Sequence, residues 1–484
     1  MKKLAVSVVV LALVGAGGYF GGEYLLDRSA NAALESIKAS LPAGSTLEHG
    51  TLKTNLLRRE VTLDGFQVTV SQAGASARLS AGSLRLQGLP WISGSNIELG
   101  EIDIADLRIE RGDVITARRW EIDRPSVDII GRLAIGQNGT NQNPDLGFSA
   151  SRVEGLTINR AGSKKLEAAI DKIDAGAMQH NRLSHVELTG IAASSQDITG
   201  PLVKMTVARM TADDLDLGHV LAADGNIDLL APLLNNYLSG LAISNLSLGP
   251  DGGEPIVLDN LVVTGSGLPD GTRTALDLKV DRLTVPMAAM APQAAEYYRA
   301  LGYDKQVIGL EVVGRYDPEQ KTFALDPLKL SALDAGSISL KLEFGGVSNL
   351  SDLKGGQAAA QMVMSALTLN ALDLNVQDGS FTKRVIAQGA KRMEVTPEVY
   401  IEQLTNSIRP IRAGGGQGGQ KLGQLYGAVA SFLLNPGELS ILAHPESPVP
   451  ILGLLFSAND PAGAAEKLNI SASNRQLPQT PVSP

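Results

Sequence analysis

Cysteine is absent from the 484 residues of the chain, and aromatic residues account for only 4% of them. Without cysteine the protein has no disulfides, thiolate zinc sites, iron–sulfur clusters or cysteine nucleophiles. Basic residues are also few, because 42 Lys and Arg stand against 51 Asp and Glu, which gives a formal net charge of -9. A nonspecific nucleic-acid binder needs a basic surface that displaces counterions, so the sequence argues against a nucleic-acid partner.

Apolar residues, in contrast, make up 44% of the chain, and charged residues make up 19%. This composition is too apolar for a disordered chain and predicts a sizeable buried core. The length is sufficient for two or three domains of ordinary size.

The first 26 residues are typical of a membrane anchor. Lys2 and Lys3 precede a run of small and apolar residues at positions 4–20. As a helix this run measures about 26 Å, close to the ~30 Å hydrocarbon core of a bilayer. We expect a single-pass helix in the bacterial inner membrane, with the bulk of the chain in the periplasm, because the basic residues stay inside. A cleavable signal peptide is the alternative, since residues 14–16 form a small-residue processing site.

Apolar residues beyond the anchor recur in two extended patterns. Segment 337–344 alternates perfectly between polar and apolar residues, which predicts a half-buried antiparallel strand. A second motif has apolar residues at i, i+2, i+5 and i+7 around a mostly polar pair. Its copies are Val61/Leu63/Phe66/Val68, Leu84/Leu86/Leu89/Trp91, Ile102/Ile104/Leu107/Ile109, Leu241/Ile243/Leu246/Leu248, Ile256/Leu258/Leu261/Val263, Leu278/Val280/Leu283/Val285, Phe323/Leu325/Leu328/Leu330 and Leu367/Leu369/Leu372/Leu374.

The central pair of this motif shifts the alternation by one residue. Either a two-residue hairpin turn or a bulge that keeps the apolar residues on one face explains the shift. In both cases many short antiparallel strands share one apolar face. The predicted fold class is therefore α+β and mainly β, with an N-terminal transmembrane helix, an elongated antiparallel sheet and covering helices.

The expected organisation along the chain has five parts. They are an anchor at 1–26, a helical stalk at 27–46, a β-rich body at 47–350, a mixed α/β region at 351–475 and a flexible tail at 476–484. Helical spacing of apolar residues predicts helices at 219–238, 286–301, 381–393, from 396 onward, at 421–434 and shortly after Asp460. The glycine-rich segment 413–420 is expected to be a hinge, and 438–443 to be the last strand.

No motif in the chain indicates a reaction, so we expect no enzyme, no catalytic residue, no cofactor and no metal site. Gly414, Gly416 and Gly419 formally match G-x-G-x-x-G, but no apolar strand precedes them. A linker is the better interpretation of this segment. The five histidines lack the spacing of metal ligands, and we expect them on the surface or in turns.

The N-terminal region resembles the YdgA-like bacterial envelope proteins of unknown function. The resemblance consists of a short basic start, the Val-Gly-Ala-Gly-Gly-Tyr-Phe-Gly-Gly-Glu-Tyr exit of the anchor, an amphipathic helix at 29–40 and Leu-Pro-Ala-Gly-Ser-Thr-Leu. More diffusely, the repeated Leu-x-Leu-Asp-x-Leu-x-Val lines are similar to those of the AsmA-like superfamily. This resemblance implies an inner-membrane-anchored periplasmic protein with a curved sheet, in a superfamily associated with lipid movement and outer-membrane integrity.

Two noncatalytic functions compete. In the first, a concave apolar face shields or moves lipid, with phospholipid and the membrane as partners; its candidate lining residues are Ile338, Leu340, Leu342, Phe344, Leu278, Val280, Leu283 and Val285. The alternative for these residues is a closed core packed against the helices. In the second, a structural or assembly factor binds another envelope protein through sheet edges and the glycine-rich region. An open groove favours the first function, and an exposed apolar patch or an unpaired edge favours the second.

Overall fold

The structure is a computed structural model. It describes residues 31, 34–35, 38, 41, 44–55, 57–72, 75–88, 100–125, 147–160, 164–197, 201–217, 238–267, 273–347, 365–408, 416–456 and 460–476. The chain forms two compact units. Unit 1 consists of Met1–Pro232 and Tyr237–Gly253, and unit 2 consists of Leu233–Asn236 and Glu254–Pro484.

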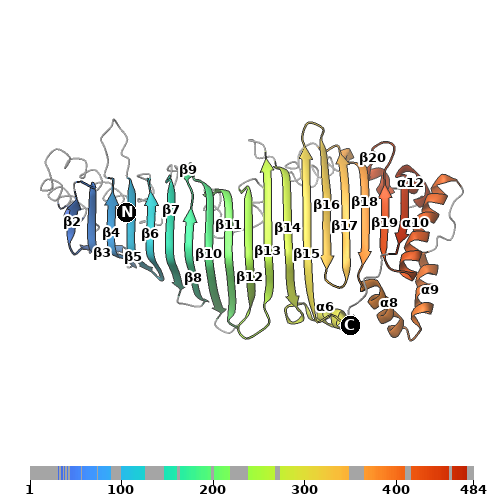
Figure 1. Cartoon of the computed structure of the whole chain (residues 1–484), viewed down its shortest axis with the longest axis horizontal. Coiled ribbons are helices and arrows are strands. Elements are labelled where there is room, and N and C mark those ends of the chain that lie inside the picture. Colours follow the sequence, from blue (N-terminus) through green and yellow to red (C-terminus); the bar gives the residue numbers. More distant parts are fainter. Residues whose placement is uncertain are drawn as a thin grey trace. The chain divides into compact units, whose positions relative to one another are not determined.

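Unit 1 is built from antiparallel strands that pair mostly in chain order (Figure 1). Both β1 and β2 pair with β3, and β8 pairs with β10 across the short β9. The strands are β1 (Thr46–Glu48), β2 (Leu52–Asn55), β3 (Glu60–Gln72), β4 (Ala75–Gln87), β5 (Glu101–Arg111), β6 (Asp113–Asp123), β7 (Ala150–Arg160), β8 (Lys164–Ala175), β9 (Met178–Gln179), β10 (Arg182–Asp197), β11 (Val203–Asp216) and β12 (Gly240–Pro250).

Unit 2 continues the same construction and adds helices. Its strands β13 to β18 pair in chain order, β18 also pairs with β19 and β20, and β19 pairs with β21, all antiparallel. The elements are β13 (Ile256–Gly267), β14 (Arg273–Pro286), η2 (Met287–Ala289), α6 (Pro292–Ala300), β15 (Lys305–Asp317), β16 (Thr322–Ala332), β17 (Gly336–Gly345), β18 (Thr368–Asp378), α8 (Phe381–Arg392), α9 (Pro397–Ile408), α10 (Gln417–Leu434), β19 (Glu438–Ala443), β20 (Val449–Pro450), α11 (Ile451–Phe456), α12 (Pro461–Lys467) and β21 (Ile470–Arg475).

The prediction of a mainly β, antiparallel protein with a few helices is confirmed, but the strands are not short. Strand β10 has 16 residues and β14 has 14, whereas strands of about five or six residues are the most common in globular proteins. The reason is that the polar pair of the motif lies inside the strands instead of at hairpin turns. The hairpin interpretation is therefore wrong for the seven copies whose central pair lies within one described strand, and the bulge interpretation explains them. In the copy that begins at Leu84, Leu89 and Trp91 lie outside the described residues.

In unit 1 the irregular positions form a continuous line across nine strands. On each strand an unpaired residue lies opposite an unpaired residue of the next strand. Between β4 and β5 and between β6 and β7 one further residue on each strand is also unpaired. The line, termed here the transverse line, consists of Gly65, Gly82, Asp106, Arg118, Gly155, Asp171, Gly190, Ala208 and Asn245.

Every second residue of the transverse line has a left-handed backbone. These residues are Gly65 (φ 63°), Asp106 (φ 51°), Gly155 (φ 61°), Gly190 (φ 64°) and Asn245 (φ 52°). In a regular strand successive side chains point to opposite faces. One additional residue in a strand shifts this alternation by one position. Because the paired strand also has an additional residue there, the residues on both sides of the line keep their partners. The apolar side chains on the two sides of the line therefore remain on one face.

A buried core lies at the first strands of unit 1. It contains Leu47, Val61 and Leu63, together with Leu34, whose side chain is only 1% exposed. The described residues of the predicted stalk helix, namely 31, 34, 35 and 38, are helical. Packing of Leu34 on β3 therefore fixes this segment to the sheet. Residues 4–20 of the expected anchor lie outside the described residues, and within those residues no helix is long and apolar enough to cross a bilayer.

The elements of unit 2 follow the sequence prediction except at α10, at segment 286–301, and at α11, β20 and β21, which the sequence does not predict. Helix α10 begins at Gln417, so residues 417–420 form a helical turn instead of a hinge, and residues 413–415 lie outside the described part. Segment 286–301 contains a 3-10 turn followed by α6, because Pro292 starts a new helix. Strand β21 follows the expected last strand. The predicted helix 219–238 lies almost entirely outside the described residues.

Candidate functional site

The eight candidate lining residues lie on one face of the sheet in unit 2. Strand β14 carries Leu278, Val280, Leu283 and Val285, and strand β17 carries Ile338, Leu340, Leu342 and Phe344. Strands β15 and β16 lie between them (Figure 1). Leu310 of β15 lies opposite Val280 of β14 and Leu330 of β16. Leu330 in turn lies opposite Ile338 of β17, so the two sets belong to one continuous surface.

Irregularities within the strands keep this surface apolar along its length. In β14, Arg282 has a left-handed backbone (φ 52°) and separates Val280 from Leu283. In β16, the register shifts between Leu325 and Leu328. Each irregularity adds one residue and thereby returns the next apolar side chain to the same face.

Among the paired, described residues of β14 to β18, the one charged side chain on this face is Asp378, at the end of β18 opposite Gly336. The rest of the face is uncharged. We term the surface the apolar face. Besides the eight candidates it contains Leu276, Gln306, Ile308, Leu310, Val312, Gly314, Tyr316, Phe323, Leu325, Leu328, Leu330, Ala332, Leu369, Leu372, Leu374 and Val376. Sequence reasoning missed Ile308, Leu310 and Val312 as candidates, although their alternation with Gly309 and Glu311 is a regular strand signal.

The exposure of side chains varies over the apolar face. Ile338 is 45% exposed and Leu330 is 44% exposed, and the other seven candidates are half-buried. Other side chains on the same face are buried: Tyr316 and Leu369 are 6% exposed, and Val263 of β13, which lies opposite Leu278, is 2% exposed. Side chains of β14 to β17 therefore present apolar surface on which an apolar ligand can lie.

Helix α10 covers the sheet beyond β18 and reaches the apolar face at Val376. Ala428 and Phe432 of α10 pack against Leu439 of β19, with Ile441 and Ala472 at the margin of this cluster. A covering helix, as expected from the sequence, is thus present at β19 and β21. It buries the end of the sheet and leaves the candidates on β14 and β17 half-buried or exposed.

The opposite face of the same strands is charged. Arg315 of β15 forms two hydrogen bonds to Asp277 of β14, and the Lys341 Nζ lies 2.8 Å from an Asp326 carboxylate oxygen. The hydrogen bond to Asp326 raises the pKa of Lys341. These exposed pairs keep one side of the sheet solvated and contribute little net stability.

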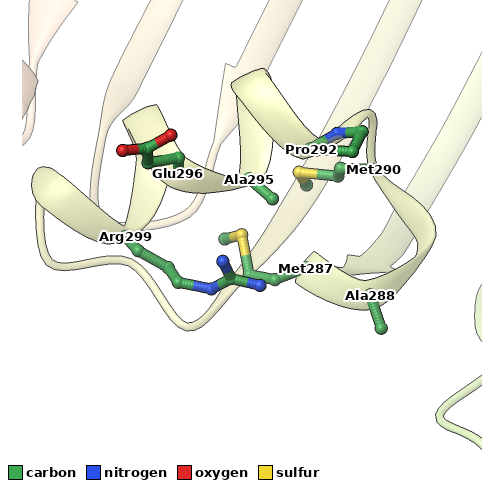
Figure 2. Close-up of a pocket in the computed structure, with 7 residues that line it drawn as sticks. All are labelled: Met287, Ala288, Met290, Pro292, Ala295, Glu296 and Arg299. Carbon is green, nitrogen blue, oxygen red and sulfur yellow. The ribbon is translucent and has the colours of Figure 1, made fainter.

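A cavity of about 410 Å³ lies at the end of β14, between η2 and α6. Figure 2 shows Met287, Met290, Pro292 and Ala295 around it, with Arg299 extending beside Met287 and Glu296 pointing away. Met287 follows Val285 at a spacing of two residues, so the cavity continues the apolar spacing of β14. Its charged lining residues are Glu296 and Arg299.

Three carboxylates in unit 1, from Glu101, Asp103 and Glu121, have oxygens within 4.8 Å of one another. Arginines pair with all three. Arg85 reaches Glu101 at 3.1 Å and Asp103 at 2.9 Å, while Arg119 contacts Asp103 at 2.9 Å and Glu121 at 2.6 Å. The hydrogen bond from Arg119 lowers the pKa of Asp103. The cluster is therefore an ion-pair network on the polar face of the sheet.

Part of the chain is similar to a known family. A family model described as "Uncharacterized protein" matches residues 329–475, from within β16 to the end of β21. No curated protein matches the chain. The matched segment includes Ile338, Leu340, Leu342 and Phe344 of the apolar face.

Proposed function

We propose that the protein is anchored in the bacterial inner membrane and shields or moves lipid along the apolar face in the periplasm, which contributes to envelope integrity. The observation that carries this proposal is the uncharged, partly exposed surface of β14 to β17. The resemblance to AsmA-like proteins supports it, as does the apolar run at 4–20. The proposal also includes a curved sheet and a noncatalytic role.

The physical basis is the transfer of acyl chains from water to an apolar surface. Each buried CH₂ group contributes about 0.8 kcal/mol, so contact with part of one acyl chain is sufficient for binding. On β14 to β17, no charged group of the described apolar face loses its hydration when a chain lies on it. The charged opposite face keeps the sheet soluble while lipid is bound.

Photocrosslinking in the full chain tests the proposal. A benzophenone amino acid at position 340 places the reactive group on the apolar face, and the same amino acid at position 339 places it on the opposite face, beside Lys329 and Asn375. With cells labelled in radioactive phosphate, we expect a phospholipid adduct from position 340 and none from position 339. Addition of Leu342→Asp should reduce the yield from position 340, because it puts a charge beside the acyl chain.

Two outcomes contradict lipid handling at this face. Equal lipid adducts from positions 339 and 340 would show only that the protein lies near a membrane. A protein adduct of defined size from position 340, without lipid, would assign the face to an envelope partner and favour an assembly factor.

A further inference from the structure

The turn between β2 and β3 presents an apolar side chain directly to solvent. Leu57 is 98% exposed, whereas the next most exposed large apolar side chain among the described residues, Leu333, is 63% exposed. An isolated exposed leucine at a surface is ordinary, but a side chain with almost no protein contact at the tip of a hairpin gains nothing from folding. Leu57 is therefore free to contact a surface outside the chain.

Local hydrogen bonds hold Leu57 away from the sheet. Asn55 of β2 lies opposite Glu60 of β3, which closes the hairpin, and the Asn55 Oδ1 accepts a hydrogen bond from the Arg58 backbone N–H at 3.1 Å. Arg59 has a left-handed backbone (φ 52°), which completes the reversal of the chain. This geometry leaves Leu57 in the turn, between Asn55, which accepts the hydrogen bond, and the left-handed Arg59.

The chemistry of the tip is apolar and cationic. Arg58 is exposed and has no ion-pair partner among the described residues, and the half-buried Arg59 follows it. Many other arginines of unit 1 pair with carboxylates across the strands. A leucine beside arginines suits the interface of a bilayer, since the leucine enters the acyl region and guanidinium groups bind lipid phosphates.

The position of the tip along the chain also favours a lipid bilayer as its partner. Leu34 packs in one core cluster with Val61 and Leu63 of β3, the strand that follows the tip. Leu34 lies fourteen positions after residue 20, where the apolar run of the expected anchor ends, and a helix of that length would span about 21 Å. The tip begins four residues before Val61, which is roughly 13 Å of strand. The anchor thus keeps the tip within reach of the bilayer.

We propose that residues 57–59 form a second membrane contact, in which Leu57 enters the interface of an anionic phospholipid bilayer and Arg58 binds lipid phosphates. This contact rests on the membrane anchoring in the proposed function, and it is independent of lipid binding at the apolar face. It would hold the first strands of unit 1 against the membrane that the anchor spans.

The absence of cysteine makes a single-label test direct. The full-length Leu57→Cys variant carries an environment-sensitive fluorophore and is reconstituted in nanodiscs of phosphatidylcholine with or without phosphatidylglycerol. We expect blue-shifted emission and quenching by spin-labelled lipid when phosphatidylglycerol is present. Leu333→Cys is the matched control, because Leu333 is an exposed leucine in a turn of unit 2. Its label should keep the emission of a fluorophore in water.

Charge reversal tests the contribution of Arg58. Arg58→Glu in the labelled Leu57→Cys background should shift the equilibrium between inserted and free tip by about fivefold or more toward the free tip. Emission typical of water from position 57 in both lipid compositions would overturn the proposal. Equal quenching in both compositions would overturn its anionic part. Neither result depends on the lipid adduct at position 340, so failure here and failure of lipid handling are distinguishable.

Discussion

Single residues on the transverse line determine the face of the sheet to which the side chains of half a strand point. A left-handed residue costs most side chains about 1–2 kcal/mol, whereas glycine adopts this conformation freely and Asp and Asn tolerate it best. Gly155 and Gly190 are glycines, while Asp106 and Asn245 are the tolerated types. At Gly190 contact adds a second restriction, because a Cβ would lie 2.0 Å from the Asp171 Oδ2 on the neighbouring strand.

We expect Gly190→Ala to lower the free energy of unfolding by more than the about 1–2 kcal/mol of the backbone alone, which urea unfolding measures. Gly252→Ala is the matched control, since Gly252 has φ 75° and a Cβ there meets nothing within 4 Å. In the Gly190→Ala/Asp171→Ala double variant, removal of the Asp171 carboxylate should restore part of the lost free energy of unfolding. Equal losses in the two alanine variants, with no recovery, would show that contact with Asp171 plays no part.

Some helices and strands of unit 2 are determined by neighbouring residues in the sequence, and others depend on tertiary contacts. The sequence predicts α8, β19 and the start of α9 to within about two residues, because their signals are neighbouring residues such as Pro397 and Gly437. Strand β21 is not predicted, since its six residues have few apolar side chains and their extended form depends on pairing with β19. The start of α10 at Gln417 is not predicted for a similar reason. Glycine disfavours a helix, so a helical turn that contains Gly418 and Gly419 depends on tertiary contacts.

Helix α10 offers a test of that explanation. A Cβ on Gly418 would lie 2.3 Å from the Ala462 carbonyl oxygen, so Gly418→Ala should separate α10 from α12 and destabilise the protein by about 1–3 kcal/mol. Gly423 is exposed in the same helix and a Cβ there meets nothing within 4 Å. Gly423→Ala should therefore raise the thermal midpoint, with a gain of up to about 1 kcal/mol. A gain from both substitutions would show that α10 and α12 are not in close contact.

Across the whole molecule, each unit has a sheet with one apolar and one charged face. The sequence predicts that the eight candidates share a face, because alternation along a strand is a local property. It does not predict that Leu330 and Ile338 are exposed while Val263 is buried, since accessibility depends on what packs against the sheet. Whether the sheet stays open to lipid is therefore decided by tertiary structure and not by the pattern of residues.

Acid should destabilise the protein through its charged face. Hydrogen bonds from Lys53, Arg119 and Arg160 lower the pKa of Asp64, Asp103 and Asp113 below the ordinary value of 3.8. A carboxyl whose pKa is lowered by folding stabilises the protein above the unfolded-state pKa and loses that contribution as the pH falls toward the folded-state pKa. We expect the free energy of unfolding to decline below about pH 4.

Arg119→Gln identifies the contribution of one pair. This substitution should lower the free energy of unfolding by about 1 kcal/mol or less at pH 7, because the Arg119 side chain is 44% exposed. The difference from the wild type should shrink as the pH falls below about 4, where Asp103 becomes protonated in both proteins. An equal difference at pH 7 and at acid pH would show that the loss comes from the packing of the arginine side chain.

Deletion of one residue from the middle of a strand in unit 1 would exchange the two faces of half of that strand. Without Gly155, for example, strict alternation would turn Leu156 and Ile158 toward the charged side of β7. Loss of a residue from an exposed turn would leave both faces unchanged. Related chains with this architecture should therefore vary in length at their turns and keep a constant number of residues between each strand end and the transverse line.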